Sequence, residues 1–276
     1  MIENSKLTSA RISEYLAEGK RFDGRKLNEF RDIKVDLSLS KKAEGGAKVK
    51  IGETEVWVGV KMSVGEPYPD SLDQGNLMVT SELTPLSNNK YEYGPPKFPT
   101  IELGRLVDRG IRESGFLDLK KLCIKEGELV WNVFIDVYSI NDAGNVLDAA
   151  FIGTLAALQT TKIPKYDEKK KQIDYDAKPV SDLPLTDKVP LNFSVYKLGG
   201  SIFLDPSYEE EMSSEGKLVF AAIPDKPFKI CSMQKSETID LTIEEFSDML
   251  DLVEKAYEGL MKEVKKKIEE AKKVKK

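Results

Sequence analysis

The sequence predicts an α+β protein with mixed β-sheets, packed helices and two lobes. Segments with apolar residues at every second position, typical of strands, alternate with segments whose apolar residues recur at helical spacing. Between residues 162 and 190 the composition shifts abruptly to Lys, Asp and Pro. We therefore expect an N-terminal lobe of residues 1–190, with an exposed insertion or linker at about 162–190, and a C-terminal lobe of residues 191–276.

The first predicted elements are a helix followed by strands. Ile12, Tyr15 and Leu16 indicate an N-terminal helix that stops at Gly19. Alternating apolar residues then predict three strands, of which the last two form a hairpin that turns at Gly52 and Glu53. These strands cover residues 33–39, 47–51 and 56–64.

The next segment suited to a sheet is unusually apolar. Residues 130–140 carry apolar side chains on both faces, which predicts a buried central strand. After a turn at residues 142–145, the segment 146–160 is rich in Ala and Leu and almost uncharged. This composition predicts a helix that is packed on all sides.

The second lobe is expected to open with a hairpin around Gly199 and Gly200. Two further strands follow near residues 217–223 and 228–233. Thr242 and Glu245 have the spacing of a capping box, and apolar residues then recur at helical spacing to Ile268. We expect one long helix to close the chain.

Composition excludes several kinds of site. The chain of 276 residues has no histidine, so it cannot contain a Ser-His-Asp triad, a Cys-His pair or a His-ligated zinc ion. We expect no cofactor and no metal ion. Cys123 and Cys231 lie far apart in apolar or strand-like segments, so we expect both thiols to be buried and reduced. No apolar run approaches the length of about 18 residues that suggests a membrane span, and we expect a cytoplasmic protein with no membrane contact.

The segment between residues 99 and 116 carries the most informative pattern of charge. At about 100° per residue, Arg105, Arg109 and Arg112 fall within an arc of roughly 60° on one helix face. Forked guanidinium groups repeated along a helix suit a polyanion better than a single carboxylate. The alternative is a solvated helix face, in which Glu102 and Asp108 serve as ion-pair partners, above all for Arg105.

A second basic cluster ends the chain. The net charge is −5, but the last fifteen residues hold eight lysines against three glutamates. A solvated helix end explains this cluster, because lysines complement the C-terminal dipole, and a general attraction for RNA is the alternative.

Three segments together resemble the RNase PH family. The first, from Lys20 to Arg25, is similar to the Arg-x-Asp-Gly-Arg signature that precedes the first core strand of that family. The second is the Gly52-x-Thr54-x-Val56 entry into the hairpin strand, and the third is the helix with arginines at residues 105, 109 and 112. The resemblance implies an RNase PH-like fold. It also implies the family activity, which is phosphorolytic shortening of RNA from its 3′ end.

The chain departs from the catalytic pattern of that family at two places. Active members bind phosphate with a Gly-(Ser or Thr)-Arg turn, but the matching residues here are Gly144, Asn145 and Val146, and valine offers no charge. Active members also carry two aspartates six residues apart. Here Asp205 is retained and the second position is Glu211, whose longer side chain changes the geometry of any metal site.

This pattern resembles the non-catalytic RNase PH-type subunit of the archaeal exosome. The resemblance implies that the chain pairs with a catalytic RNase PH-type subunit and that three such heterodimers close into a hexameric ring with RNA-binding cap subunits. It also implies that Arg105, Arg109 and Arg112 contact single-stranded RNA held for the partner's active site. Tyr91 and Tyr93 are further candidates, for stacking on bases, although packing within their loop is an alternative. Two other functions stay open, namely a self-sufficient phosphorolytic exoribonuclease that uses Asp205 and Glu211, and a purely architectural ring member.

Overall fold

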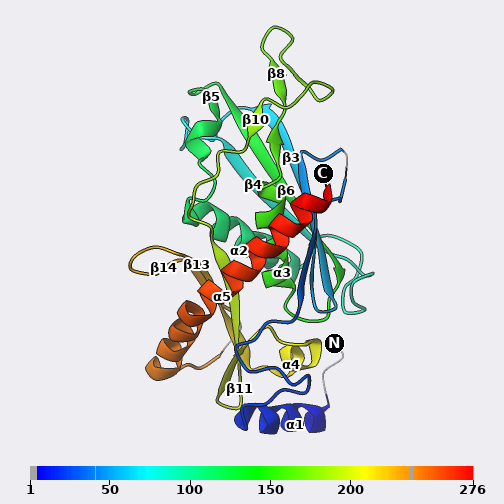
Figure 1. Ribbon diagram of the computed structural model, residues 1–276, viewed down its shortest axis with the longest axis vertical. Helices are drawn as coiled ribbons and strands as arrows, with labels where there is room; N and C mark the ends of the chain where they lie inside the picture. The colour runs from blue at the N-terminus through cyan, green and yellow to red at the C-terminus, as the bar shows by residue number, and fades with distance from the viewer. Residues whose placement is uncertain (1–4, 41, 237–238, 276) are drawn as a thin grey trace.

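The N-terminal half of the chain forms a mixed β-sheet of six strands. The computed structural model describes residues 5–40, 42–236 and 239–275 (Figure 1). The strands follow the order β1-β2-β3-β6-β4, with β5 beside β6, and β4 is the one strand of this sheet that runs parallel to its neighbour. The six strands are β1 (Ile33–Asp36), β2 (Gly45–Ile51), β3 (Thr54–Gly65), β4 (Asn76–Leu83), β5 (Cys123–Lys125) and β6 (Leu129–Asn141).

The C-terminal half contributes an antiparallel sheet with the order β12-β11-β13-β14. Its predicted hairpin is confirmed, because Gly199 and Gly200 turn between β11 and β12 with φ values of 57° and 80° that favour glycine. The strands are β11 (Leu191–Leu198), β12 (Ser201–Leu204), β13 (Gly216–Ile223) and β14 (Lys229–Ser236).

The helices fill the space between and around the two sheets. All thirteen residues of α3 are buried, and this helix packs against β2, β3 and β11, which confirms the prediction of a helix packed on all sides. Helix α2 lies against β4 of one sheet and β14 of the other. The helical segments are α1 (Lys6–Ala17), α2 (Phe98–Ser114), η1 (Leu119–Leu122), α3 (Val146–Leu158), α4 (Tyr208–Ser213) and α5 (Ile243–Lys275).

Helix α5 crosses both parts of the molecule (Figure 1). The predicted capping box is present, because the Thr242 amide donates to Glu245 Oε2 at 2.9 Å and the Glu245 amide donates to Thr242 Oγ1 at 3.1 Å. The apolar side of the helix is buried, including Met249 and Ile268. In the described part of the chain, no helix is both long and apolar enough to cross a membrane.

The N-terminal helix packs on the second sheet rather than on the first. Ile12 and Leu16 of α1 share a small buried cluster with Tyr196, Leu198 and Phe203 of β11 and β12. The main core is one continuous cluster that contains residues of both sheets. The division of the chain at residue 190 stays a prediction.

The segment 162–190 is largely exposed but contains short strands. Its hairpin of β8 and β9 projects at the top of Figure 1. Half-buried Ile163, Tyr166 and Ile173 anchor the segment on the main core. The strands are β7 (Lys162–Ile163), β8 (Lys165–Asp167), β9 (Gln172–Asp174) and β10 (Ser181–Asp182).

Three details differ from the prediction. Strand β4 was not predicted, because its mixed polar and apolar residues at a sheet edge lack a clear alternation. The central strand β6 is buried on only one face, and Tyr138 on its other face is 42% exposed. Cys123 and Cys231 are free thiols but only partly buried.

Candidate nucleic-acid interface

Helix α2 has clear start and stop signals in its sequence. Pro99 lies in its first turn, where a missing amide hydrogen has no cost, and Gly115 ends it in the left-handed region with φ of 66°. The apolar side packs inward as predicted, with Leu103, Leu106, Val107 and Ile111 buried. The arginine side therefore faces outward.

Arg105 is the freest of the three predicted arginines. Its side chain is exposed, and it makes no hydrogen bond or ion pair with any other described residue. The prediction that Arg105 is the arginine most prone to pair with Glu102 or Asp108 is therefore wrong. Glu102 instead accepts a hydrogen bond from Ser236 at 3.1 Å.

Arg112, in contrast, is held by the protein itself. Its Nη2 atom lies 2.7 Å from Asp108 Oδ1 and 2.9 Å from the carbonyl oxygen of Leu77 in the edge strand β4. The hydrogen bond with Asp108 raises the pKa of Arg112 above its ordinary value. Asp108 lies one helical turn before Arg112, and this i,i+4 spacing favours the ion pair.

Arg109 is intermediate between these cases. It is half-buried, and its Nη1 atom donates to Gln234 Oε1 of β14 at 3.3 Å. This single long contact to a neutral amide leaves most of the guanidinium donors of Arg109 available.

Arg105 and Arg109 border a groove with a volume of about 670 Å³ beside β4, the last strand of its sheet. The groove combines these two cations with apolar side chains, among them Met78, Ile101 and Phe134. A cationic border with an aromatic side chain beside it is the chemistry that holds single-stranded nucleic acid.

Asp205, a candidate acid from the sequence analysis, is buried in ion pairs. Asp205 is fully buried, and its carboxylate accepts five N–H hydrogen bonds, from the Arg31 backbone and side chain, from Arg25 and from Asn145. Burial alone would raise the pKa of Asp205, but the hydrogen bonds and charge of Arg31 hold this pKa below its ordinary value. A carboxylate with five donors has no free position for a metal ion.

The basic residues of the N-terminal motif are structural too. Arg21 is buried, forms an ion pair with Glu210, and donates to the carbonyl oxygens of Leu204 and Asp205 at 2.9 and 2.7 Å. Arg25 contacts Asp205 Oδ2 at 2.9 Å. These contacts fix the segment before β1 onto the loop before α4.

Glu211 and the turn before α3 lie together, although 66 residues separate them. The amide of Asn145 donates to Glu211 Oε2 at 2.9 Å, and Tyr196 donates its hydroxyl to Glu211 Oε1 at 2.7 Å. Sequence reasoning gave no signal for this contact, because it depends on how α4 packs beside α3.

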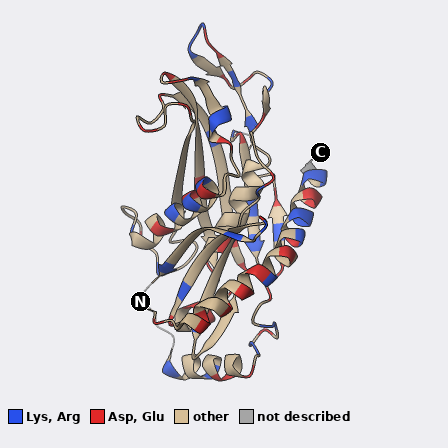
Figure 2. Cartoon of the chain, turned by 90° about the vertical axis from the view of Figure 1, so that its left-hand side faces the viewer, with Lys and Arg blue, Asp and Glu red and all other residues tan. Residues whose placement is uncertain are grey.

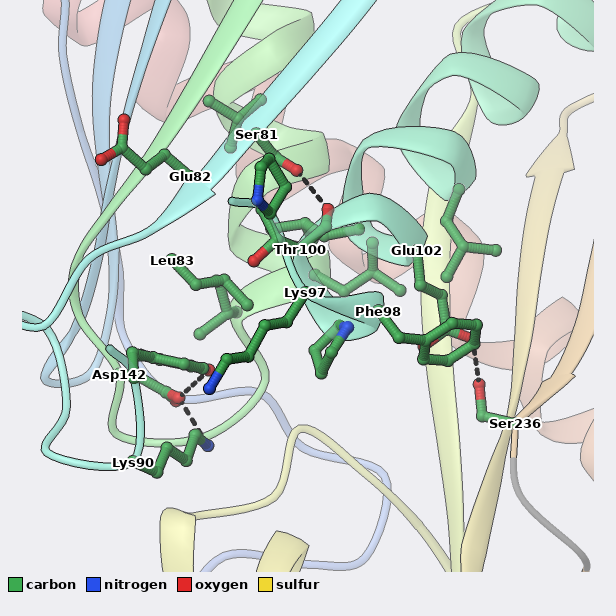
Figure 3. A pocket seen from close by; sticks show the side chains of 18 of the residues that line it. Ser81, Glu82, Leu83, Lys90, Lys97, Phe98, Thr100, Glu102, Asp142 and Ser236 are labelled. Atoms are coloured by element: carbon green, nitrogen blue, oxygen red, sulfur yellow. Dashed lines mark hydrogen bonds and ion pairs between the residues drawn. The ribbon is translucent and has the colours of Figure 1, made fainter. Parts of the chain in front are cut away.

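The same turn borders a larger pocket between the two sheets, with a volume of about 990 Å³ (Figure 3). Lys90 forms an ion pair with Asp142 at 2.7 Å, and Tyr91 donates its hydroxyl to the same carboxylate at 2.7 Å. Tyr91 is thereby fixed within its loop, as the packing alternative holds, whereas Tyr93 is 89% exposed.

The lysine-rich end of α5 is partly neutralised by local pairs. Lys267 lies 3.5 Å from Asp32, and Lys272 lies 2.7 Å from Glu269. Figure 2 shows basic residues gathered toward the C-terminus of this helix and acidic residues in its first half. This arrangement complements the helix dipole and favours the solvated helix end over an RNA contact.

Two family models match the chain. The model of the 3′ exoribonuclease family, domain 1, matches residues 29–164, and that of domain 2 matches residues 188–256. The chain belongs to the RNase PH family. The RNase PH-like fold predicted from the three motifs is thereby confirmed.

Two exosome components named Rrp42 resemble the chain over most of its length. The chain is 46% identical over 235 residues to the exosome complex component Rrp42 of Methanocella arvoryzae. The aligned region covers 85% of this chain and 86% of that protein. The chain is 42% identical to Rrp42 of Thermococcus onnurineus, over 87% of this chain and 88% of that protein.

Two solved structures of exosome chains have a similar fold over most of the chain. A chain of an Archaeoglobus fulgidus exosome with RNA bound to the active site superposes with a TM-score of 0.83 at 38% identity, covering 93% of this chain and 97% of that one. A chain of an archaeal exosome core gives a TM-score of 0.80 at 37% identity, covering 94% of this chain and 96% of that one.

Proposed function

We propose that this chain is a non-catalytic subunit of an archaeal exosome ring. It pairs with a catalytic RNase PH-type subunit, helps to bind single-stranded RNA and shapes the partner's active site for 3′ to 5′ phosphorolytic degradation. The groove bordered by Arg105 and Arg109 carries this proposal, because these two cations form no ion pair with a described residue, whereas Asp205 is committed to ion pairs. Similarity to Rrp42 components of exosomes supports it.

The assembly we propose contains three heterodimers in a hexameric ring, with RNA-binding cap subunits, in the cytoplasm. Resemblance to the exosome core chains supports this assembly. β4 has no strand partner on its outer side, and Tyr138 of β6 is exposed, so both leave surface that a partner subunit would cover.

The RNA contact we propose is independent of sequence. Guanidinium groups bind phosphates, which fix the position of a strand without reading its bases. Phe134 offers an aromatic surface within the same groove. Arg105 and Arg109 make the main contacts, and Arg112 contributes less because Asp108 and Leu77 already hold it.

A reconstituted complex with the catalytic subunit tests this function. We expect Arg105→Ala combined with Arg109→Ala to weaken binding of single-stranded RNA by about tenfold or more, because phosphate contacts supply most of such affinity. Arg11→Ala is the matched control, since it removes an exposed arginine from α1. RNA affinity and degradation that are equal in the double variant and the control would instead favour a purely architectural subunit.

An activity assay of the isolated chain distinguishes this function from that of a self-sufficient exoribonuclease. We expect the purified chain to release no nucleoside diphosphates from single-stranded RNA in the presence of phosphate. Release of these products by the purified chain alone would show that the chain is itself the enzyme.

A further inference from the structure

Two acids of helix α2 lie within reach of Arg105, and neither pairs with it. Glu102 precedes Arg105 by three residues and Asp108 follows it by three, so each lies about one helical turn away. This spacing favours an ion pair on a helix surface. Arg105 nevertheless makes no hydrogen bond or ion pair with any residue of the described ranges 5–40, 42–236 and 239–275.

Glu102 is held by the second sheet. Its Oε1 atom accepts a hydrogen bond from the hydroxyl of Ser236 in β14 at 3.1 Å, a contact that Figure 3 shows at the large pocket. Ser236 is almost completely buried. Glu102 and Ser236 both line the pocket of about 990 Å³, whereas Arg105 borders the groove of about 670 Å³. The Ser236 hydroxyl thus holds the carboxylate toward the pocket and away from Arg105.

Asp108 is occupied by Arg112. Both of its carboxylate oxygens accept from that guanidinium, Oδ1 from Nη2 at 2.7 Å and Oδ2 from Nε at 3.1 Å. A two-point contact of this kind fixes the orientation of the carboxylate. Among the described residues that line the groove, Asp108 is the one acid. Its pairing with Arg112 therefore leaves no unpaired carboxylate beside Arg105.

Arg105 stays free although its surroundings favour a partner. Arg109 follows one turn later, and like charges at i,i+4 spacing repel each other. An ion pair with either neighbouring acid would relieve this repulsion. The fold directs both acids elsewhere, which leaves an unneutralised cation beside the groove and preserves it for an anionic ligand.

We propose that Ser236 and Arg112 are positioning residues that keep Arg105 unpaired, by holding Glu102 and Asp108 away from it. The inference rests on the proposed function, because it assigns how a cation that contacts RNA is kept available. Arg112 acts here through Asp108. Ser236 acts from β14 of the second sheet, so the packing of that sheet against α2 sets the charge available at the groove.

The chemical reactivity of Arg105 in the full isolated chain tests the inference without RNA. Phenylglyoxal modifies free guanidinium groups, and mass spectrometry measures the rate at Arg105. We expect Ser236→Ala to slow this modification by about twofold, because the released Glu102 forms a helical ion pair of modest stability. Adding Glu102→Gln should restore the native rate. Ser232→Ala is the matched control, because it removes a hydroxyl from the same strand.

Arg112→Gln tests the second contact, because glutamine can still donate to the Leu77 carbonyl but cannot form an ion pair with Asp108. It should also slow the modification of Arg105 by about twofold. Adding Asp108→Asn should reverse this effect, and no reversal would contradict the role of Arg112.

An unchanged rate at Arg105 in a folded Ser236→Ala would overturn the inference, and circular dichroism verifies the folding. Should Ser236→Ala fail to fold, Glu102→Gln in the native chain decides. We expect it to leave the rate at Arg105 unchanged, because Ser236 already holds Glu102. A faster rate would show that Glu102 pairs with Arg105 in the native chain, which contradicts the inference.

RNA binding distinguishes this inference from the proposed function. In the reconstituted complex, Ser236→Ala should weaken binding of single-stranded RNA by about twofold and should have no effect when Arg105→Ala is also present. If Arg105→Ala weakens binding and Ser236→Ala does not, the inference fails and the RNA contact of Arg105 stands. If Arg105→Ala leaves binding unchanged, the proposed RNA contact fails, and the reactivity of Arg105 still decides how its neighbours pair.

Discussion

The side chains of Arg31 and Asp205 are joined by two hydrogen bonds, from Nη2 to Oδ1 at 2.7 Å and from Nε to Oδ2 at 2.9 Å, although 174 positions separate the residues in the sequence. Arg31 also donates to the carbonyl oxygens of Ala143 and Gly144 at 2.8 and 3.0 Å. One guanidinium thus connects the segment before β1, the turn before α3 and the loop before α4. Asp205 therefore holds three segments of the chain together through Arg31.

Loss of this connection should destabilise the chain. We expect Arg31→Ala to lower the free energy of unfolding by about 3 kcal/mol, because it leaves the buried Asp205 carboxylate with fewer donors. Urea denaturation at neutral pH measures the change. Arg11→Ala, which breaks an exposed pair with Glu14, should change stability by less than about 0.5 kcal/mol. Similar values for both variants would contradict the structural role of Arg31.

Stability should fall as the pH rises from about 4 to 6. Burial raises the pKa of Asp148 to about 6, although Asn192 and Ser194 donate hydrogen bonds that oppose the shift. Since the folded pKa exceeds the unfolded one, the stabilisation is complete below about pH 4 and is lost as the pH passes 6, by about 3 kcal/mol in total.

Asp148→Asn isolates this effect, because the amide cannot ionise and its oxygen can still accept the bond from Asn192. Urea denaturation across this pH range should show a flatter profile for the variant than for the native chain. Parallel profiles would exclude Asp148 as the source. The pKa of Asp205 is lowered instead, so the stabilisation from its ionised form is present throughout this pH range and is lost only as the pH falls below it.

The salt dependence of RNA binding should report on Arg105. One phosphate contact to a single strand contributes about 0.7 to the slope of log affinity against log salt concentration. We expect Arg105→Ala, measured in the reconstituted complex by fluorescence anisotropy, to reduce the slope by about this amount. An unchanged slope would mean that Arg105 makes no phosphate contact.

Arg112 should behave differently from Arg105. Its loss leaves Asp108 and the Leu77 carbonyl of β4 without a partner, so Arg112→Ala should cost about 1 kcal/mol of stability. Arg105→Ala, which breaks no contact among the described residues, should cost less than about 0.5 kcal/mol. Thermal denaturation compares the two, and a larger loss for Arg105→Ala would reverse our assignment.

Local patterns in the sequence were sufficient for most elements of the fold. The capping box at Thr242 and the glycine turn at Gly199 act through neighbours in the chain, so their meaning is visible without the tertiary structure. The same holds for α3, whose almost uncharged composition predicts burial on every side. Strand β4 was not predicted, because an edge strand that pairs in parallel needs no regular alternation of apolar and polar residues.

The candidate site was predicted only in part. Helical spacing placed the three arginines on one face of α2, but it could not rank them, because their partners Gln234 and Leu77 belong to distant strands.

The sequence by itself determined the family, the order of most elements and the presence of a cationic helix face, since each depends on residues close together in the chain. Only the tertiary structure decided which cations stay free, that Asp205 is neutralised by Arg31, and that Glu211 lies on the Asn145 amide. These outcomes depend on contacts between segments up to 174 positions apart, and the packing of the two sheets around α3 sets those contacts.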